Sequence, residues 1–194
     1  MRLFSFRPAL TVRGRAAHGL RGLAGKPLHP PLTDIPVGAY VLAAAFDLIS
    51  VLTSGDLARE LYRAATFALI GGAAVSLLAT ATGVADWLGS TPRRTQAWRT
   101  VNAHALTMST LTLLVLALIA LRLTRYADAP AAPLLVLTMS ALAAALTALG
   151  GTIGGSLVYD YGFNVETATD SPVWHESEDD LLPGEKGADS LQDQ

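Results

Sequence analysis

The 194-residue sequence contains no cysteine. Disulfides, a covalently attached c-type haem, thiolate metal sites and a cysteine-held iron–sulfur cluster are therefore excluded within this chain. The sequence also shows no Ser–His–Asp spacing, no phosphate-binding loop and no paired catalytic carboxylates. Hydrolase and kinase chemistry are thus not indicated, no catalytic residue is assigned, and a non-enzymatic role is favoured.

Charged residues are scarce, at 15% of the chain against about 25% in an average soluble domain. Three segments contain no Asp, Glu, Lys or Arg, and each is longer than the ~20 apolar residues that cross a bilayer as a helix. A soluble bundle would need a polar stripe on each helix, and these segments have none. The sequence therefore predicts an all-α, integral membrane four-helix bundle, with apolar runs at 35–54, 64–85, 100–121 and 133–158.

Turn signals and small residues define the expected bundle further. Small residues recur every four positions in three of the runs, which favours close helix packing in lipid. The helices are expected from near Pro36 to Ser54, from Tyr62 to Trp87, from Thr100 to Leu121 and from Pro133 to Asp160.

The two ends of the chain carry opposite charge. Residues 1–28 hold six bases and no acid, and residues 163–194 hold nine acids and one base. We expect a basic cytoplasmic arm at 1–28, a transmembrane domain at 29–162 and an acidic, disordered tail at 163–194. Nine basic residues lie on the side of the N-terminus and four on the other side. This asymmetry predicts a multi-pass protein of the inner membrane with both termini in the cytoplasm.

Two histidines mark the starts of two similar intervals. His29 precedes Asp86 by 57 positions, and His104 precedes Asp160 by 56. This spacing suggests two hairpins in a parallel repeat, with both histidines facing each other on the side of the N-terminus. Because Pro30 and Pro31 follow His29, we expect this residue to lie just ahead of its helix.

A motif around the first histidine resembles a known family. The pattern is His29-Pro30-x-Leu32-x-Asp34-x-Pro36, followed by Phe46-Asp47-Leu48, Gly83-x-x-Asp86-Trp87, His104 and Leu157-Val158-Tyr159. It is similar to the bacterial membrane proteins called domain of unknown function 2231, over roughly residues 25–165. The resemblance implies a four-span membrane protein. Some members are fused to a Rieske-type iron–sulfur domain, which this cysteine-free chain cannot reproduce itself.

Four functions remain open for these residues. The first is a redox module that binds haem b or a quinone between His29 and His104, with hydrogen bonds from Asp34, Asp86 and Asp160 that fix the ring tautomers. The second is a metal site built from the same histidine pair together with Asp34, Asp86 or Asp160. The third is a non-enzymatic assembly or anchoring subunit, and the fourth is a proton or solute path through Asp47. The expected partners are the lipid bilayer and a redox protein, and a nucleic-acid role is not indicated.

Asp47 is the one charge within the first apolar run. An ionised carboxylate that faces lipid is costly, so Asp47 is expected to face the interior of the bundle. Arg63 and Arg122 lie near the same side of the membrane and are its candidate partners.

Overall fold

The structure is a computed structural model that describes residues 19–165. Within this range the chain is all-α, as predicted, with no strand and a single bridge between Arg21 and Pro27. A short 3-10 helix, η1, precedes four long helices. These elements are η1 Leu23–Gly25, α2 His29–Leu52, α3 Gly55–Ser90, α4 Gln96–Leu123 and α5 Leu134–Tyr159. The expectations for a lipid-binding arm and a disordered tail concern mostly residues 1–18 and 166–194, outside the described residues.

Three of the four long helices begin earlier than their apolar runs. The α2 helix starts at His29, because Pro30 and Pro31 occupy its first turn, where a proline has no hydrogen bond to lose. The expectation that His29 lies ahead of its helix is therefore wrong. The α3 helix starts at Gly55. Its first turns carry charged residues such as Asp56 and Arg59, so the helix is longer than its apolar part.

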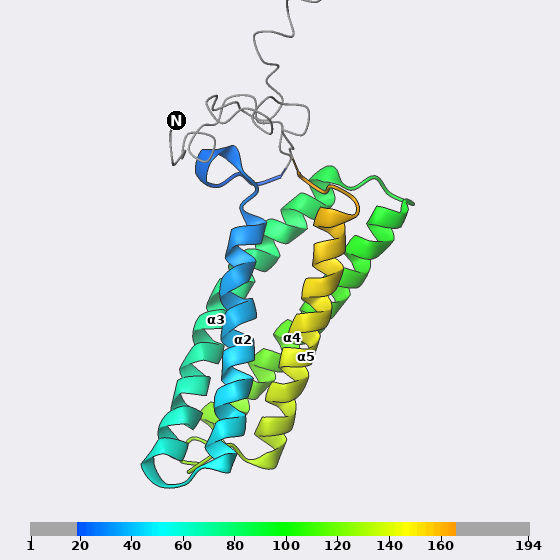
Figure 1. Cartoon of the computed structure of the whole chain (residues 1–194). Helices are drawn as coiled ribbons and strands as arrows, with labels where there is room; N and C mark the ends of the chain where they lie inside the picture. The colour runs from blue at the N-terminus through cyan, green and yellow to red at the C-terminus, as the bar shows by residue number, and fades with distance from the viewer. Residues whose placement is uncertain (1–18, 166–194) are drawn as a thin grey trace, which may run out of the picture.

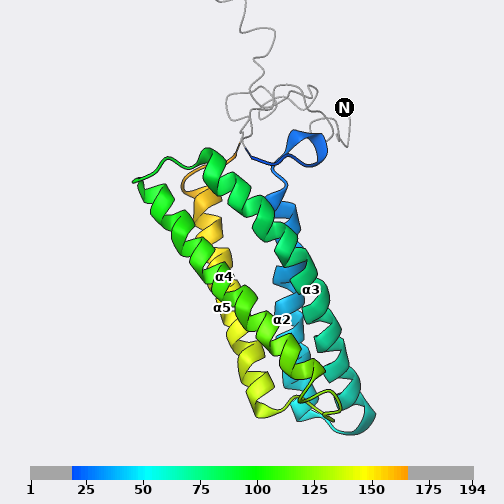
Figure 2. The ribbon, with the colours of Figure 1, turned by 180° about the vertical axis from the view of Figure 1, so that it is seen from behind.

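The four helices form a bundle in which α2 and α4 lie on a diagonal. Helix α2 packs on α3 and α5, and α4 packs on the same two helices, so the two hairpins lie side by side (Figures 1 and 2). The described ends of the chain lie at one end of the bundle, here called the terminal end. The far end carries the loops after α2 and α4.

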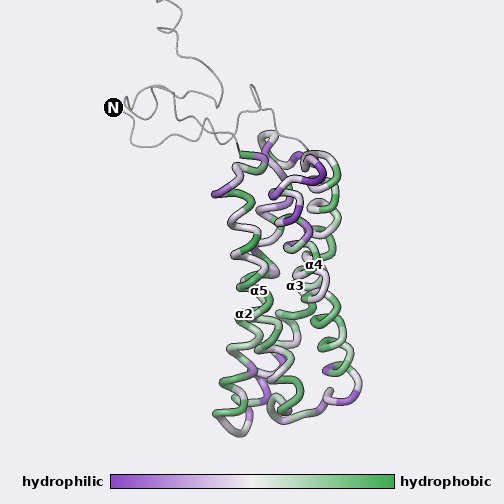
Figure 3. Tube along the Cα trace, turned by 90° about the vertical axis from the view of Figure 1, so that its right-hand side faces the viewer, coloured by the Kyte–Doolittle hydropathy of each residue, from purple (hydrophilic) through white to green (hydrophobic). Residues whose placement is uncertain are grey.

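The outer surface of the bundle is apolar. All four helices are long and apolar enough to cross a membrane. Figure 3 shows hydrophobic residues along the helices and hydrophilic residues gathered near the ends. Large side chains such as Phe67, Leu106 and Leu113 point outward and are 69–72% exposed. In a membrane this surface faces lipid, which fits the low charge content of the sequence.

The two hairpins repeat, in a register that differs from the predicted one. His29 and Asp47 of α2 correspond to His104 and Arg122 of α4, each 75 positions later. In α3 and α5 the shift is 71 positions, and buried pairs follow it along the whole helix: Ala65 and Val136, Leu69 and Ser140, Ser76 and Thr147, and Ala79 and Gly150. Asp86 therefore corresponds to Leu157 and not to Asp160, which lies beyond the end of α5 and is exposed.

Candidate functional site

The two histidines meet across the bundle near the terminal end. His29 is the first residue of α2, and His104 lies two turns into α4. Their ring centres are 6.4 Å apart, and the ring planes are inclined by 88°. Because α2 and α4 are diagonal helices, this contact spans the centre of the bundle.

Each imidazole is held by a backbone carbonyl of its own hairpin. The Nδ1 atom of His29 lies 2.8 Å from the carbonyl oxygen of Ala79, and Nδ1 of His104 lies 3.0 Å from that of Gly150. A carbonyl oxygen can only accept, so Nδ1 carries the hydrogen in both rings. In the neutral rings Nε2 then keeps its lone pair, which is the form of histidine that binds a metal.

Two glycines make room for these rings. A Cβ atom on Gly83 would lie 2.7 Å from Cε1 of His29, and one on Gly154 would lie 3.0 Å from Cε1 of His104. Gly83 and Gly154 are equivalent in the 71-residue register. The repeat thus conserves the whole arrangement of histidine, carbonyl and glycine in both hairpins.

Both rings border a cavity of about 700 Å³ between the hairpins. This volume lies within the ~300–1,000 Å³ range of ligand pockets. All four long helices contribute to its wall, and residues 25–27 and 163–165 line it at the terminal end. Most of the lining is apolar, with side chains such as Val37, Val84, Met108 and Leu111.

The predicted acidic residues lie in different places. Asp86 is buried, lines the cavity and accepts a hydrogen bond from the backbone of Leu20. Gly19 packs on its carboxylate so closely that a Cβ atom there would overlap it. Asp34 and Asp160 are exposed. Backbone carbonyls accept the hydrogen bonds from the histidine rings that these carboxylates were expected to accept.

Within residues 19–165 no group of three or more His, Asp or Glu side chains gathers as a metal site. A structural or catalytic zinc ion takes three or four protein ligands. The histidine pair alone is therefore too small a ligand set for such an ion.

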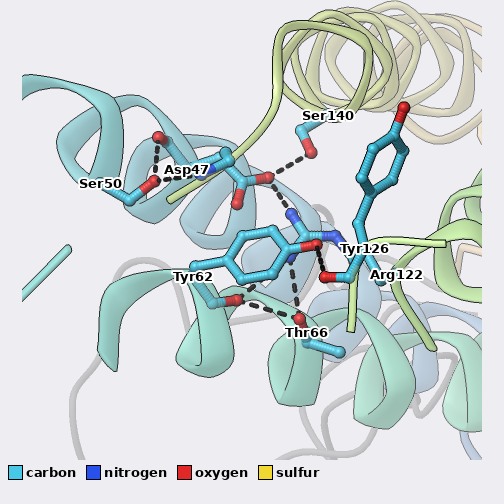
Figure 4. A network of polar contacts seen from close by, with 8 residues as sticks. Asp47, Ser50, Tyr62, Thr66, Arg122, Tyr126 and Ser140 are labelled. Atoms are coloured by element: carbon cyan, nitrogen blue, oxygen red, sulfur yellow. Dashed lines mark hydrogen bonds and ion pairs between the residues drawn. The ribbon is translucent and has the colours of Figure 1, made fainter. Parts of the chain in front are cut away.

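A second polar cluster lies toward the far end of the bundle (Figure 4). The fully buried side chains of Asp47 and Arg122 form an ion pair across the same diagonal. Ser140 also donates to Asp47, and Arg122 donates to the carbonyl of Tyr62 and the hydroxyl of Thr66. The prediction that Asp47 faces the interior is confirmed, and of its two candidate partners Arg122 forms the pair, whereas Arg63 is exposed.

The two polar clusters are separated by apolar packing. Leu69, Leu111 and Val115 lie between them along the helices, and each is at most 1% exposed. These residues belong to the hydrophobic core at the centre of the bundle.

Residues 25–167 match the family model described as "Predicted membrane protein (DUF2231)". The chain belongs to this family. Comparison with curated proteins and with solved structures gives no match. The DUF2231 match covers all four spans, both histidines, and the Asp47–Arg122 pair.

Sequence reasoning found the histidines of this DUF2231 protein but missed what holds them. The carbonyls of Ala79 and Gly150 carry no side-chain signature. Gly83 and Gly154 were a usable signal, because each lies four positions after one of these carbonyls and therefore on the same helix face.

Proposed function

We propose that this protein is a membrane electron-transfer module that binds one haem b between His29 and His104. The observation that carries the proposal is the spacing of the two rings. Imidazole nitrogen binds a metal at about 2.0–2.1 Å, so two rings on opposite sides of one iron have centres about 6 Å apart. The ring centres here are 6.4 Å apart.

The hydrogen bonds of the rings support the same ligand. Histidines that bind metals almost always donate their other ring N–H to a carboxylate, a backbone carbonyl or water, which fixes the tautomer. His29 and His104 both do so, through Ala79 and Gly150. The same bonds fix the orientation of each ring.

The number of ligands favours haem over a bare metal ion. The porphyrin itself supplies four nitrogens, so the protein needs to add only axial ligands. Two histidines complete that set, and the apolar cavity beside them suits a macrocycle. When bound, haem supplies reversible one-electron oxidation and reduction. With both His29 and His104 holding the haem, the group would serve electron transfer and would not bind a substrate.

A purely anchoring role explains these contacts less well. A structural histidine that ties the bundle together would connect one hairpin to the other. Both hydrogen bonds instead lie within a hairpin, from α2 to α3 and from α4 to α5. The two rings face each other from different hairpins, and this placement suits a shared ligand.

We further propose that the histidine end faces the cytoplasm of a bacterial cell, with the bundle in the inner membrane. The support is the excess of basic residues on this side, nine against four. Haem would then lie close to the cytoplasmic surface.

The experiment is to express the full chain with ample haem supply, purify it in detergent and record oxidised and reduced absorbance spectra. We expect about one haem per chain, with a six-coordinate, low-spin spectrum. His29→Ala and His104→Ala should each lose or weaken haem binding, whereas His175→Ala, outside the family match, should bind haem as the wild type does. A well-folded, colourless wild type would refute the proposal and favour the anchoring role.

A further inference from the structure

The exposed charges of the bundle are divided unevenly between its two ends. The far end carries three exposed bases and three exposed acids, which are Arg59, Arg63 and Arg125 against Asp56, Glu60 and Asp128. The terminal end carries five exposed bases and two exposed acids, which are Arg21, Lys26, Arg93, Arg94 and Arg99 against Asp34 and Asp160. The exposed surface of the terminal end is therefore basic, and that of the far end is balanced.

Three of the terminal-end bases lie together around the turn between α3 and α4. Arg93 and Arg94 belong to the turn, and Arg99 lies in the first turn of α4. Within residues 19–165 none of these three side chains forms an ion pair, whereas Arg59 at the far end pairs with Asp56 at 3.4 Å. Because the three guanidinium groups have no counter-charge in the described part of the chain, this surface suits an anionic partner.

Large apolar and aromatic side chains are exposed at the same end of the bundle. Leu88, five positions before Arg93, is 71% exposed, and Tyr159 at the end of α5 is 88% exposed. Trp87 and Trp98 lie on either side of the turn and are half-buried. Trp and Tyr are enriched where a membrane protein meets the headgroup region. A phospholipid places an anionic headgroup directly above an apolar chain, so it matches both the bases and the apolar residues of this surface.

We infer that the terminal end binds the headgroups of anionic phospholipids through Arg93, Arg94 and Arg99. The planar guanidinium group matches the geometry of a phosphate, to which it donates two parallel hydrogen bonds. Four apolar spans imply contact with a bilayer of any composition. The inference adds a preference for lipids of negative charge and places that preference at the α3–α4 turn. It is independent of the histidines and of any cofactor.

The test measures which lipids surround the full chain in nanodiscs that contain phosphatidylcholine and phosphatidylglycerol. One of the two lipids carries bromine on its acyl chains, and bromine quenches the fluorescence of nearby tryptophans. Trp87 and Trp98 report on the turn, and a Trp174→Phe background removes the third tryptophan, which lies outside the described residues. We expect brominated phosphatidylglycerol to quench more strongly than brominated phosphatidylcholine. High salt should reduce this difference, because exposed charges are screened.

Two triple variants locate the preference. Changing Arg93, Arg94 and Arg99 to Gln should lower the relative binding constant for phosphatidylglycerol about fivefold for each base that contacts a headgroup. Changing Arg59, Arg63 and Arg125 to Gln at the far end is the matched control and should leave the constant unchanged. Equal quenching by both lipids in the wild type, or an equal loss in the two triple variants, would overturn the inference. Loss of the preference in excess glycerol phosphate would show a site for the free anion and would overturn the assignment to lipid.

Discussion

Removal of the Asp47 carboxylate should destabilise the protein far more than removal of an exposed carboxylate. The Asp47 and Arg122 side chains are both 0% exposed, so Asp47→Leu leaves a buried guanidinium without its counter-charge. Breaking a buried pair from one side costs about 3–5 kcal/mol. Arg122 keeps its bonds to Tyr62 and Thr66, which favours the lower part of that range.

The control for this prediction is Asp56→Leu. Asp56 pairs with Arg59 at 3.4 Å, but its side chain is 90% exposed, and such pairs contribute about 0–1 kcal/mol. The double variant Asp47→Leu, Arg122→Met removes both charges and should recover most of the lost stability, since apolar replacements of buried pairs are often neutral.

The assay is reversible unfolding in mixed detergent micelles, followed by the fluorescence of the native tryptophans. The reasoning predicts a large loss for Asp47→Leu, a small one for Asp56→Leu and a near-native double variant. Equal losses for the two single variants would refute it. A double variant as unstable as the sum of its single changes would show that the pair is not coupled.

Three further predictions concern the glycines, the helix cap and the topology. Gly83→Ala and, less strongly, Gly154→Ala should lower haem content, because each new methyl group presses on a histidine ring. Gly71→Ala is the control and should leave haem content unchanged, since a Cβ atom there meets no atom within 4 Å. Equal haem content in all three variants would contradict the role of the glycines. Thr95→Ala should cost about 1 kcal/mol in the same unfolding assay, because the Thr95 hydroxyl caps α4 by accepting from the backbone N–H of Trp98; an unchanged stability would argue against the cap. A reporter fused after Gln194 should be active only if it works in the cytoplasm, and activity of a periplasmic reporter there would reverse the assignment.

The sequence predicted the spans well because uncharged runs report directly on contact with lipid. It predicted their ends less well, since a helix such as α3 continues into polar residues that hydropathy does not follow. The start of α2 at His29 shows the same effect. Pro30 and Pro31 suggested a stiff segment ahead of the helix, but a first helical turn accepts prolines equally well.

The acidic residues of the candidate site show where sequence spacing misleads. Asp34 follows His29 by five positions, about 140° around a helix, so the two side chains point in different directions. Asp160 is separated from the bundle core by the end of α5. The carbonyls that hold the rings could be located only with the packing of α2 on α3 and of α4 on α5.

The measurement that tests the central claim most directly is low-temperature electron paramagnetic resonance of the oxidised, purified protein. The account predicts a low-spin ferric haem signal of two axial imidazoles, present in the wild type and lost in His104→Ala. A high-spin haem signal in the wild type, or a signal unchanged by His104→Ala, would contradict the claim that His29 and His104 hold one iron between them.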